Sequence, residues 1–236
     1  MNLFRMDFED IVGMLRDYQI TMESQLKAIY EQETARITHL LNGIEDEESR
    51  AINLDIVADE FHYTHEVMFP RSMRYSFIVL LFLNLESLLN RFCDDIKERN
   101  SIEIRSAKLK GDSVERTRTY LHKLAKVPEI NPTIWGKIED LSKVRNCIVH
   151  ALGKVDESRD QIRIKDIAKQ GIGLTIGDSD VFEAGHLILT PDYCANAVND
   201  IASLIRELFD KAGYEPATGF WGGGATAYNT ANNDAG

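Results

Sequence analysis

The sequence predicts a mainly α-helical protein that carries a small β-hairpin before its last helix. Apolar residues recur every three or four positions over most of the chain, which is the spacing of a helix with one buried face. Good helix starts precede two of these stretches, at Asn131-Pro132 and Thr190-Pro191. Short β-branched or alternating runs are confined to residues 161–190, where Gly and Asp separate them.

The first part of the chain is expected to form two acidic helices. The spacing predicts a long helix over Asp7–Leu41, which Asn42-Gly43 ends. A second helix opens in a run of acidic residues and extends to about Phe69, because Pro70 then breaks the pattern. We expect residues 1–69 to be an N-terminal helical extension that completes the bundle, forms a dimer interface or holds a partner.

Residues 70–213 are expected to form the main helical domain. Its central helix is Arg71–Arg99, since Phe77–Leu89 is apolar nearly all round, as in an element enclosed by others. A shorter basic helix is expected over Ser113–Val127, followed by an amphipathic helix over Asn131–Gly153. This order of elements predicts a helical bundle.

The end of this domain is expected to combine short strands with the last helix. Three segments are predicted to form an antiparallel hairpin or a three-stranded patch: Gln161–Ile167, Ile172–Ile176 and His186–Thr190. The last helix begins at Thr190-Pro191-Asp192 and ends at Gly213. Residues 214–236 are rich in Gly, Ala, Asn and Thr, so we expect a flexible tail in which Phe220-Trp221 is the segment able to dock.

The composition is that of a soluble globular protein. The chain has 236 residues, of which 44% are hydrophobic and 28% charged. Its longest apolar run, Phe77–Leu83, is too short to span a bilayer, and no signal-peptide segment opens the chain, so we expect a cytoplasmic protein without membrane contact. The cysteines are scattered and odd in number, which indicates buried, reduced thiols rather than disulfides or a zinc site: Cys93, Cys147 and Cys194.

The net charge of −11 is unevenly distributed along the chain. Residues 71–154 carry 16 Lys and Arg against 10 Asp and Glu, whereas residues 1–70 carry 5 against 15. We predict that six side chains of the basic region bind RNA phosphates: Arg105, Lys108, Lys110, Arg116, Arg118 and Lys123. The alternative is that this stretch is an ordinary solvated loop and helix.

Arginine, asparagine and histidine converge at the end of the Asn131–Gly153 helix. At 100° per residue its core stripe contains six apolar residues: Ile134, Ile138, Leu141, Val144, Ile148 and Leu152. Arg145 falls about 20° from Ile134, inside this stripe, so its guanidinium must face a carboxylate, a subunit interface or an anionic ligand. Asn146 and His150 stack on the neighbouring face, because they are four residues apart.

Glu86 is the exception in the apolar central helix. It shares an arc with apolar residues, where a lone carboxylate would be costly to bury. We predict that Glu86 supports the site by pairing with Arg145. The alternative is that Glu86 sits at the edge of the bundle and reaches water.

The stretch Arg145-Asn146-Cys147-Ile148-Val149-His150 resembles the R-x4-6-H signature of the HEPN superfamily, in the form with a polar residue after the arginine. The layout from Pro70 to Gly213 is also similar to a HEPN domain, a small helical bundle with this motif late in the chain and a final helix after it. The resemblance implies a homodimer in which both motifs line one cleft. It further implies a metal-independent endoribonuclease without cofactors, whose products end in a 2′,3′-cyclic phosphate, of the kind found as toxins or in phage defence.

These residue types suit cleavage of RNA, such as transfer or messenger RNA. His150 can transfer protons near neutral pH, and the planar fork of Arg145 can hold a phosphate. Asn146 can orient the histidine or contact the phosphate. Taken alone, His150 would be an ordinary histidine beside the negative end of the helix dipole.

Two alternatives to the nuclease stay open. The chain can be a HEPN-like dimerisation adaptor without catalysis, or a nucleotide-binding partner domain that uses the same anionic pocket. For the nuclease, an antitoxin or another protein is a further candidate partner. His62-x-x-His65-Glu66 could be half of a metal site, but such histidines are usually surface or packing residues, so no metal is expected.

Overall fold

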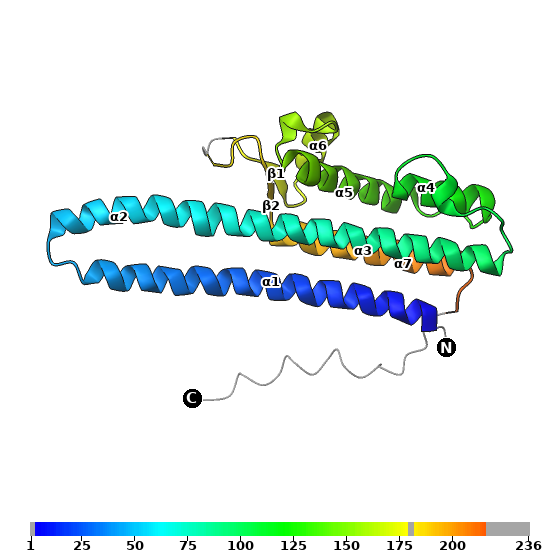
Figure 1. Cartoon of the computed structure of the whole chain (residues 1–236), viewed down its shortest axis with the longest axis horizontal. Coiled ribbons are helices and arrows are strands. Elements are labelled where there is room, and N and C mark those ends of the chain that lie inside the picture. Colours follow the sequence, from blue (N-terminus) through cyan, green and yellow to red (C-terminus); the bar gives the residue numbers. More distant parts are fainter. Residues whose placement is uncertain (1–2, 179–181, 216–236) are drawn as a thin grey trace.

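The computed structural model describes residues 3–178 and 182–215. It is an elongated stack of long helices with a smaller group of elements on one side (Figure 1). The mainly α-helical class is therefore confirmed. The long helices are α1 (Leu3–Asn42), α2 (Glu47–Phe61), α3 (Phe69–Arg99) and α7 (Pro191–Lys211). The smaller group contains α4 (Ser113–Thr119), α5 (Pro132–Ala151) and α6 (Gln161–Ala168).

Helices α2 and α3 form one continuous rod from Glu47 to Arg99, so the predicted helix end before Pro70 is wrong. A wider, π-helical turn over His62–Met68 joins the two helices. The N–H of Phe69 bonds to the carbonyl of Thr64, five residues back. This wider spacing directly before Pro70 lets the helix continue past a residue that has no N–H.

One hydrophobic core joins α1, α3, α5 and α7, with α3 in the middle. The ring of Phe209 in α7 meets those of Phe8 in α1 and Phe92 in α3 edge to face, with centroids 5.1 Å apart in each pair. The first half of α1 therefore shares its core with the domain predicted for residues 70–213. The predicted boundary at residue 69 falls inside the continuous α2–α3 rod.

The rod contains an apolar stretch that is long enough to cross a membrane, judged by length and composition. Half of this stretch is buried inside the protein. The cytoplasmic location stays a prediction.

The β-structure is a two-stranded antiparallel hairpin of β1 (Leu174–Ile176) and β2 (Leu187–Leu189), as predicted. Residues 161–167 were expected to be a further strand, and this is wrong because they lie in α6. Ile164 and Ile167 are buried on one face of that helix, while Ile162 is 77% exposed. A three-residue spacing of buried side chains belongs to a helix, whereas the alternation of Ile162 and Ile164 suggested a strand.

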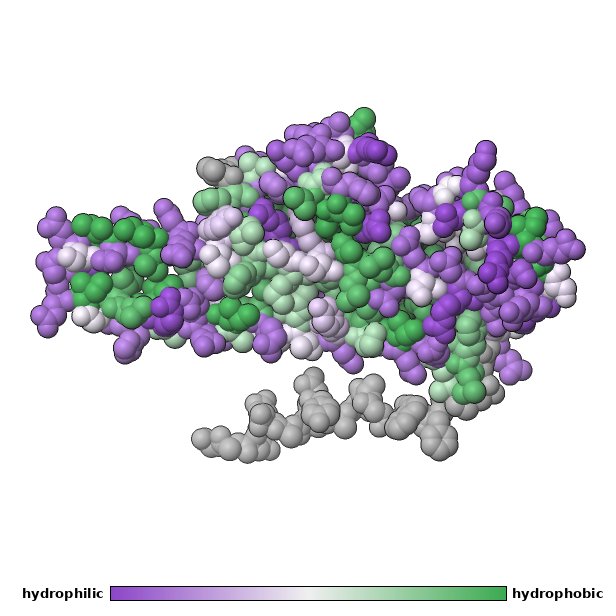
Figure 2. Space-filling model, in the orientation of Figure 1, coloured by the Kyte–Doolittle hydropathy of each residue, from purple (hydrophilic) through white to green (hydrophobic). Residues whose placement is uncertain are grey.

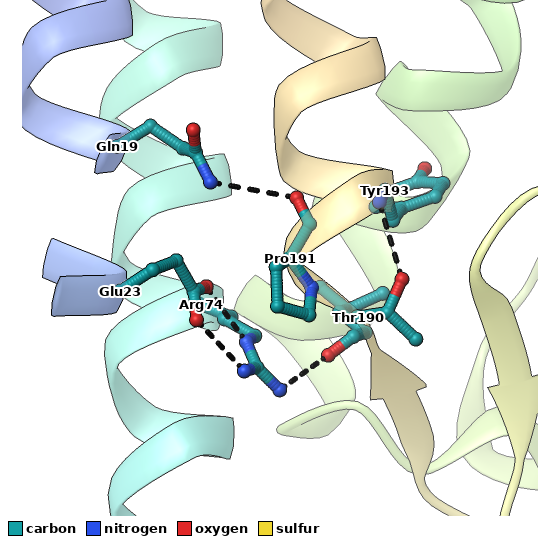
Figure 3. Close-up of polar contacts among 7 residues, drawn as sticks. Gln19, Glu23, Arg74, Thr190, Pro191 and Tyr193 are labelled. Atoms are coloured by element: carbon teal, nitrogen blue, oxygen red, sulfur yellow. Dashed lines mark hydrogen bonds and ion pairs between the residues drawn. The ribbon is translucent and has the colours of Figure 1, made fainter. Parts of the chain in front are cut away.

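A cluster of polar contacts fixes the entry to the last helix (Figure 3). Arg74 of α3 donates two hydrogen bonds of 2.9 Å to the carboxylate of Glu23 in α1 and a third, also 2.9 Å, to the carbonyl of Leu189 in β2. Thr190 caps α7 by accepting the N–H of Tyr193 at 3.3 Å, as predicted for an N-cap. Three distant parts of the chain thus meet at one guanidinium.

The chain after α7 packs back on the core. Tyr214, the first residue of the expected tail, is 8% exposed, and its ring lies 5.0 Å from that of Phe209. Its hydroxyl bonds to the carboxylate of Asp95. The rest of the expected tail, with Phe220-Trp221, lies outside the described residues.

Replacing Glu23 with Gln should lower the free energy of unfolding by about 2 kcal/mol, because the guanidinium of Arg74, only 17% exposed, loses its counter-ion. The control is Glu31→Gln on the same helix. Its partner Lys27 is 79% exposed, so we expect a loss below about 0.5 kcal/mol. Urea unfolding followed by circular dichroism measures both changes. Equal losses would show that the Arg74 cluster does not stabilise the fold.

Candidate functional site

The candidate site lies on the last turns of α5. Asn131 caps the start of this helix by accepting the N–H of Thr133 at 2.9 Å, and Pro132 follows in the first turn, as predicted. The helix ends where Leu152 adopts a left-handed conformation with φ 49° and Gly153 one with φ 82°. Leu152 is therefore 79% exposed, so its expected place on the core stripe is wrong.

Arg145 is half-buried on the side of α5 that faces Phe82 of α3. Its Nη1 donates a hydrogen bond of 3.0 Å to the side-chain oxygen of Asn146, and its guanidinium carbon lies 5.5 Å from the centre of the Phe82 ring. The Nε atom is buried and has no hydrogen-bond partner in the part of the chain that the structure describes. Within residues 3–178 and 182–215, no carboxylate forms an ion pair with it. A charged group in this setting favours an anionic ligand.

The predicted pair between Glu86 and Arg145 is not formed in the described part of the chain. Glu86 instead accepts a hydrogen bond of 2.6 Å from the hydroxyl of Ser113 in α4. Helices α3 and α5 run in opposite directions, because Tyr75 adjoins Gly153 while Phe82 adjoins Arg145. Glu86 lies one turn further along α3 than Phe82, which moves it away from the guanidinium and toward α4.

His150 is exposed on the last turn of α5, four residues after the half-buried Asn146. Histidine and asparagine side chains at this spacing lie on one helix face. Several apolar side chains of α3 and of the end of α5 are exposed, with exposed fractions between 39% and 79%: Leu80, Leu83, Val149 and Leu152. Figure 2 shows apolar residues gathered on the visible face over α3 and α5. The motif therefore combines an accessible proton-transfer group with an apolar surface.

The predicted RNA-binding side chains lie toward the opposite end of α5, around α4 (Figure 1). Some are already partnered by acids: Arg118 lies 3.2 Å from Glu139 and 3.6 Å from Glu129, and Arg105 lies 4.0 Å from Asp94. Arg116 donates to the carbonyl of Gly111 at 3.3 Å. Lys108, Lys110 and Lys123 are exposed and make no ion pair among the described residues. These three lysines are the stronger candidates for phosphate contacts.

A cavity of about 530 Å³ lies between α4, the following turn over Tyr120–Leu124 and α5. Arg118 and Lys123 line it, as do Ser142 and Lys143, which lie about one turn before Arg145 and Asn146. Sequence reasoning did not single out Ser142 or Lys143. Their position one turn before the motif, on the same helix, was the available signal. The cavity therefore lies beside the basic region and reaches α5 about one turn before the motif.

The two histidines of the possible half metal site do not converge. Nδ1 of His62 lies 3.0 Å from the carboxylate of Glu66, while the ring of His65 lies between those of Phe61 and Phe69 at 5.0 and 5.1 Å. No group of three or more potential metal ligands occurs in the described ranges.

The thiols are free and buried, as predicted. Burial raises the pKa of Cys93 to about 11 and that of Cys194 to about 12, and it also raises the pKa of Cys147 inside the motif. The thiols are therefore protonated near neutral pH and are poor nucleophiles. Cys147 therefore contributes to packing.

Comparison of the chain with protein-family models, with curated proteins and with solved structures gave no match.

Replacing Gly153 with Ala should lower the free energy of unfolding by about 2–4 kcal/mol. A Cβ atom there would lie 2.0 Å from the hydroxyl of Tyr75, which donates a hydrogen bond of 2.6 Å to the carbonyl of Leu187, and φ is already positive. The control is Gly171→Ala, which has φ 68° but open space around it, so only the backbone cost of about 1 kcal/mol applies. Urea unfolding compares the two. Equal losses would show that the end of α5 does not depend on this close approach.

Proposed function

We propose that this protein is a metal-independent endoribonuclease of the HEPN type. The observation that supports the proposal best is the half-buried guanidinium of Arg145, which lacks a carboxylate partner among the described residues and lies beside Asn146 on the helix that presents His150. A permanent positive charge without a counter-ion suits a phosphodiester. An exposed histidine one turn further along suits proton transfer.

The proposed reaction begins with attack of a ribose 2′-hydroxyl on the adjacent phosphorus. His150 takes the hydroxyl proton, the oxygen–phosphorus bond forms, and the bond to the 5′-oxygen of the next nucleotide breaks. Arg145 stabilises the negative charge that builds on the phosphate oxygens. Asn146 holds the guanidinium through its side-chain oxygen at 3.0 Å. The products are a 2′,3′-cyclic phosphate and a 5′-hydroxyl, and the leaving oxygen receives a proton from the second His150 of a homodimer.

The homodimer is part of the proposal because one motif offers a single histidine for two proton transfers. The exposed apolar residues Leu80, Leu83, Val149 and Leu152 supply a surface through which two copies can bring their motifs together. A role as a toxin or in phage defence, with an antitoxin as partner, would follow from the same activity.

A second candidate function is that of an adaptor without catalysis. It is favoured by Arg105 and Arg118, whose charges are partly neutralised by Asp94, Glu129 and Glu139, which weakens phosphate binding. In that case the apolar face over α3 and α5 would serve protein contacts alone.

Replacing His150 with Ala should abolish cleavage of total and transfer RNA in the presence of EDTA, because no group remains to take the 2′-hydroxyl proton. The control is His39→Ala, which removes an exposed histidine of α1 and should leave the rate unchanged. Gel electrophoresis measures cutting, and end-group analysis detects the cyclic phosphate. Equal cutting by His150→Ala would contradict the proposal, and no cutting by the folded, dimeric wild type would favour the adaptor.

Replacing Arg145 with Lys should lower the cleavage rate by about tenfold or more, because lysine keeps the charge but loses the planar fork. Arg159→Lys, at an exposed arginine after the helix, serves as the control and should have no effect. Single-turnover rates measure both. An unchanged rate for Arg145→Lys would show that the guanidinium does not hold the reacting phosphate.

A further inference from the structure

Residues 27–61 form a two-helix arm that extends beyond the rest of the protein (Figure 1). The arm contains the second half of α1, the loop after it, and α2. None of its side chains is buried, whereas the first half of α1 buries residues as far as Leu26. The ring of Phe61 meets that of Tyr30 with centroids 5.1 Å apart at the base of the arm. A helix pair with so little buried surface gains little stability from its own packing.

The outer face of α2 carries apolar side chains that nothing in the described chain covers. Ile52 and Ile56 are 56% and 63% exposed and lie one turn apart on the same face. Ile52 precedes Phe61 by nine residues, which places it about 180° around the helix from the side that faces α1. Figure 2 shows apolar residues on the arm among charged ones.

The apolar stripe continues from the arm toward the β-hairpin. Tyr63 follows Ile56 by seven residues, which returns it to nearly the same helix face. It is 37% exposed, and its ring lies 4.5 Å from that of Phe182, which is 42% exposed. Ile52, Ile56, Tyr63 and Phe182 together form what we call the outer stripe.

The arm is strongly acidic. It contains 9 Asp and Glu against 3 Lys and Arg. Asp55, Asp59 and Glu60 flank the outer stripe and are all exposed, and none of them forms an ion pair within the described ranges. Glu60 acts electrostatically on Arg36 of α1 without forming an ion pair with it. Exposed carboxylates beside an apolar stripe attract a partner with the opposite charge.

We propose that the arm binds a basic amphipathic helix of another protein. The apolar face of that helix would cover the outer stripe, and its Lys and Arg side chains would pair with Asp55, Asp59 and Glu60. The added helix turns a marginal pair into a three-helix bundle. A second copy of this arm would bring like charges together, and an anionic membrane surface would be repelled in the same way. The inference does not depend on the proposed nuclease activity.

The test uses the full-length protein and a fluorescein-labelled, 18-residue amphipathic peptide made of leucine and lysine. Fluorescence anisotropy at physiological salt should show binding, and a leucine–glutamate peptide of the same pattern should not bind. The double change Ile52→Ser and Ile56→Ser should weaken binding at least about tenfold, because two anchoring side chains are lost. The control is Met14→Ser with Ile20→Ser, which removes two exposed apolar residues of α1 outside the arm and should leave binding unchanged.

A second variant tests the charges. Changing Asp55 and Asp59 to Asn and Glu60 to Gln should weaken binding and make it less sensitive to salt. Circular dichroism confirms that each variant is folded. The proposal is overturned if wild type does not bind the basic peptide, or if both isoleucine changes leave the affinity unchanged. It is also overturned if sedimentation velocity shows a dimer that the isoleucine changes abolish, since the stripe would then hold a second copy.

Discussion

The guanidinium of Arg74 holds together parts of the chain that lie far apart in sequence. It reaches Glu23 in α1 and the carbonyl of Leu189 at the end of β2, directly before the cap of α7. Because α1 and α7 both pack on α3, the contacts of Arg74 define the positions of α1 and α7 along the axis of α3. The edge-to-face phenylalanine rings of the core lie on helices that are aligned in this way. The ends of α5 and of the hairpin are positioned by the next residue in α3, because the hydroxyl of Tyr75 donates a hydrogen bond to the carbonyl of Leu187.

The candidate site depends on this alignment in a direct way. Gly153 passes so close to Tyr75 that a side chain would not fit, and this close passage places the last turn of α5 against α3. Arg145 thereby comes to lie over Phe82 with no acid beside it in the described chain. The site thus owes its unbalanced positive charge to the antiparallel alignment of two helices.

Local chemistry in the sequence predicted the helix starts well. Asn131 and Thr190 cap their helices because a side-chain oxygen can reach an N–H two or three residues on, which needs no knowledge of the rest of the protein. The helix end predicted before Pro70 is wrong, because the wider turn that lets the helix continue past this proline belongs to the whole α2–α3 rod and not to the residues beside Pro70. The strand predicted over residues 161–167 is wrong, because isoleucines at alternating positions occur both in strands and at the edge of the buried face of a helix. The partner of Glu86 could not be predicted, since it depends on how α3, α4 and α5 are aligned.

The π-helical turn over His62–Met68 gives the arm a mechanical property. Between this turn and the start of α2 lie about 15 residues, or roughly 22 Å of helix. A bend of about 10° at the turn would swing the tip of the arm by roughly 4 Å, while the rod beyond it stays packed in the core. The wider turn interrupts the regular hydrogen bonds between each N–H and the carbonyl four residues before it. Bending is therefore easier there than elsewhere along the rod. Because Tyr30 of α1 contacts Phe61 of α2 at the base of the arm, the second half of α1 would have to bend together with α2, so the two helices of the arm would move as one unit.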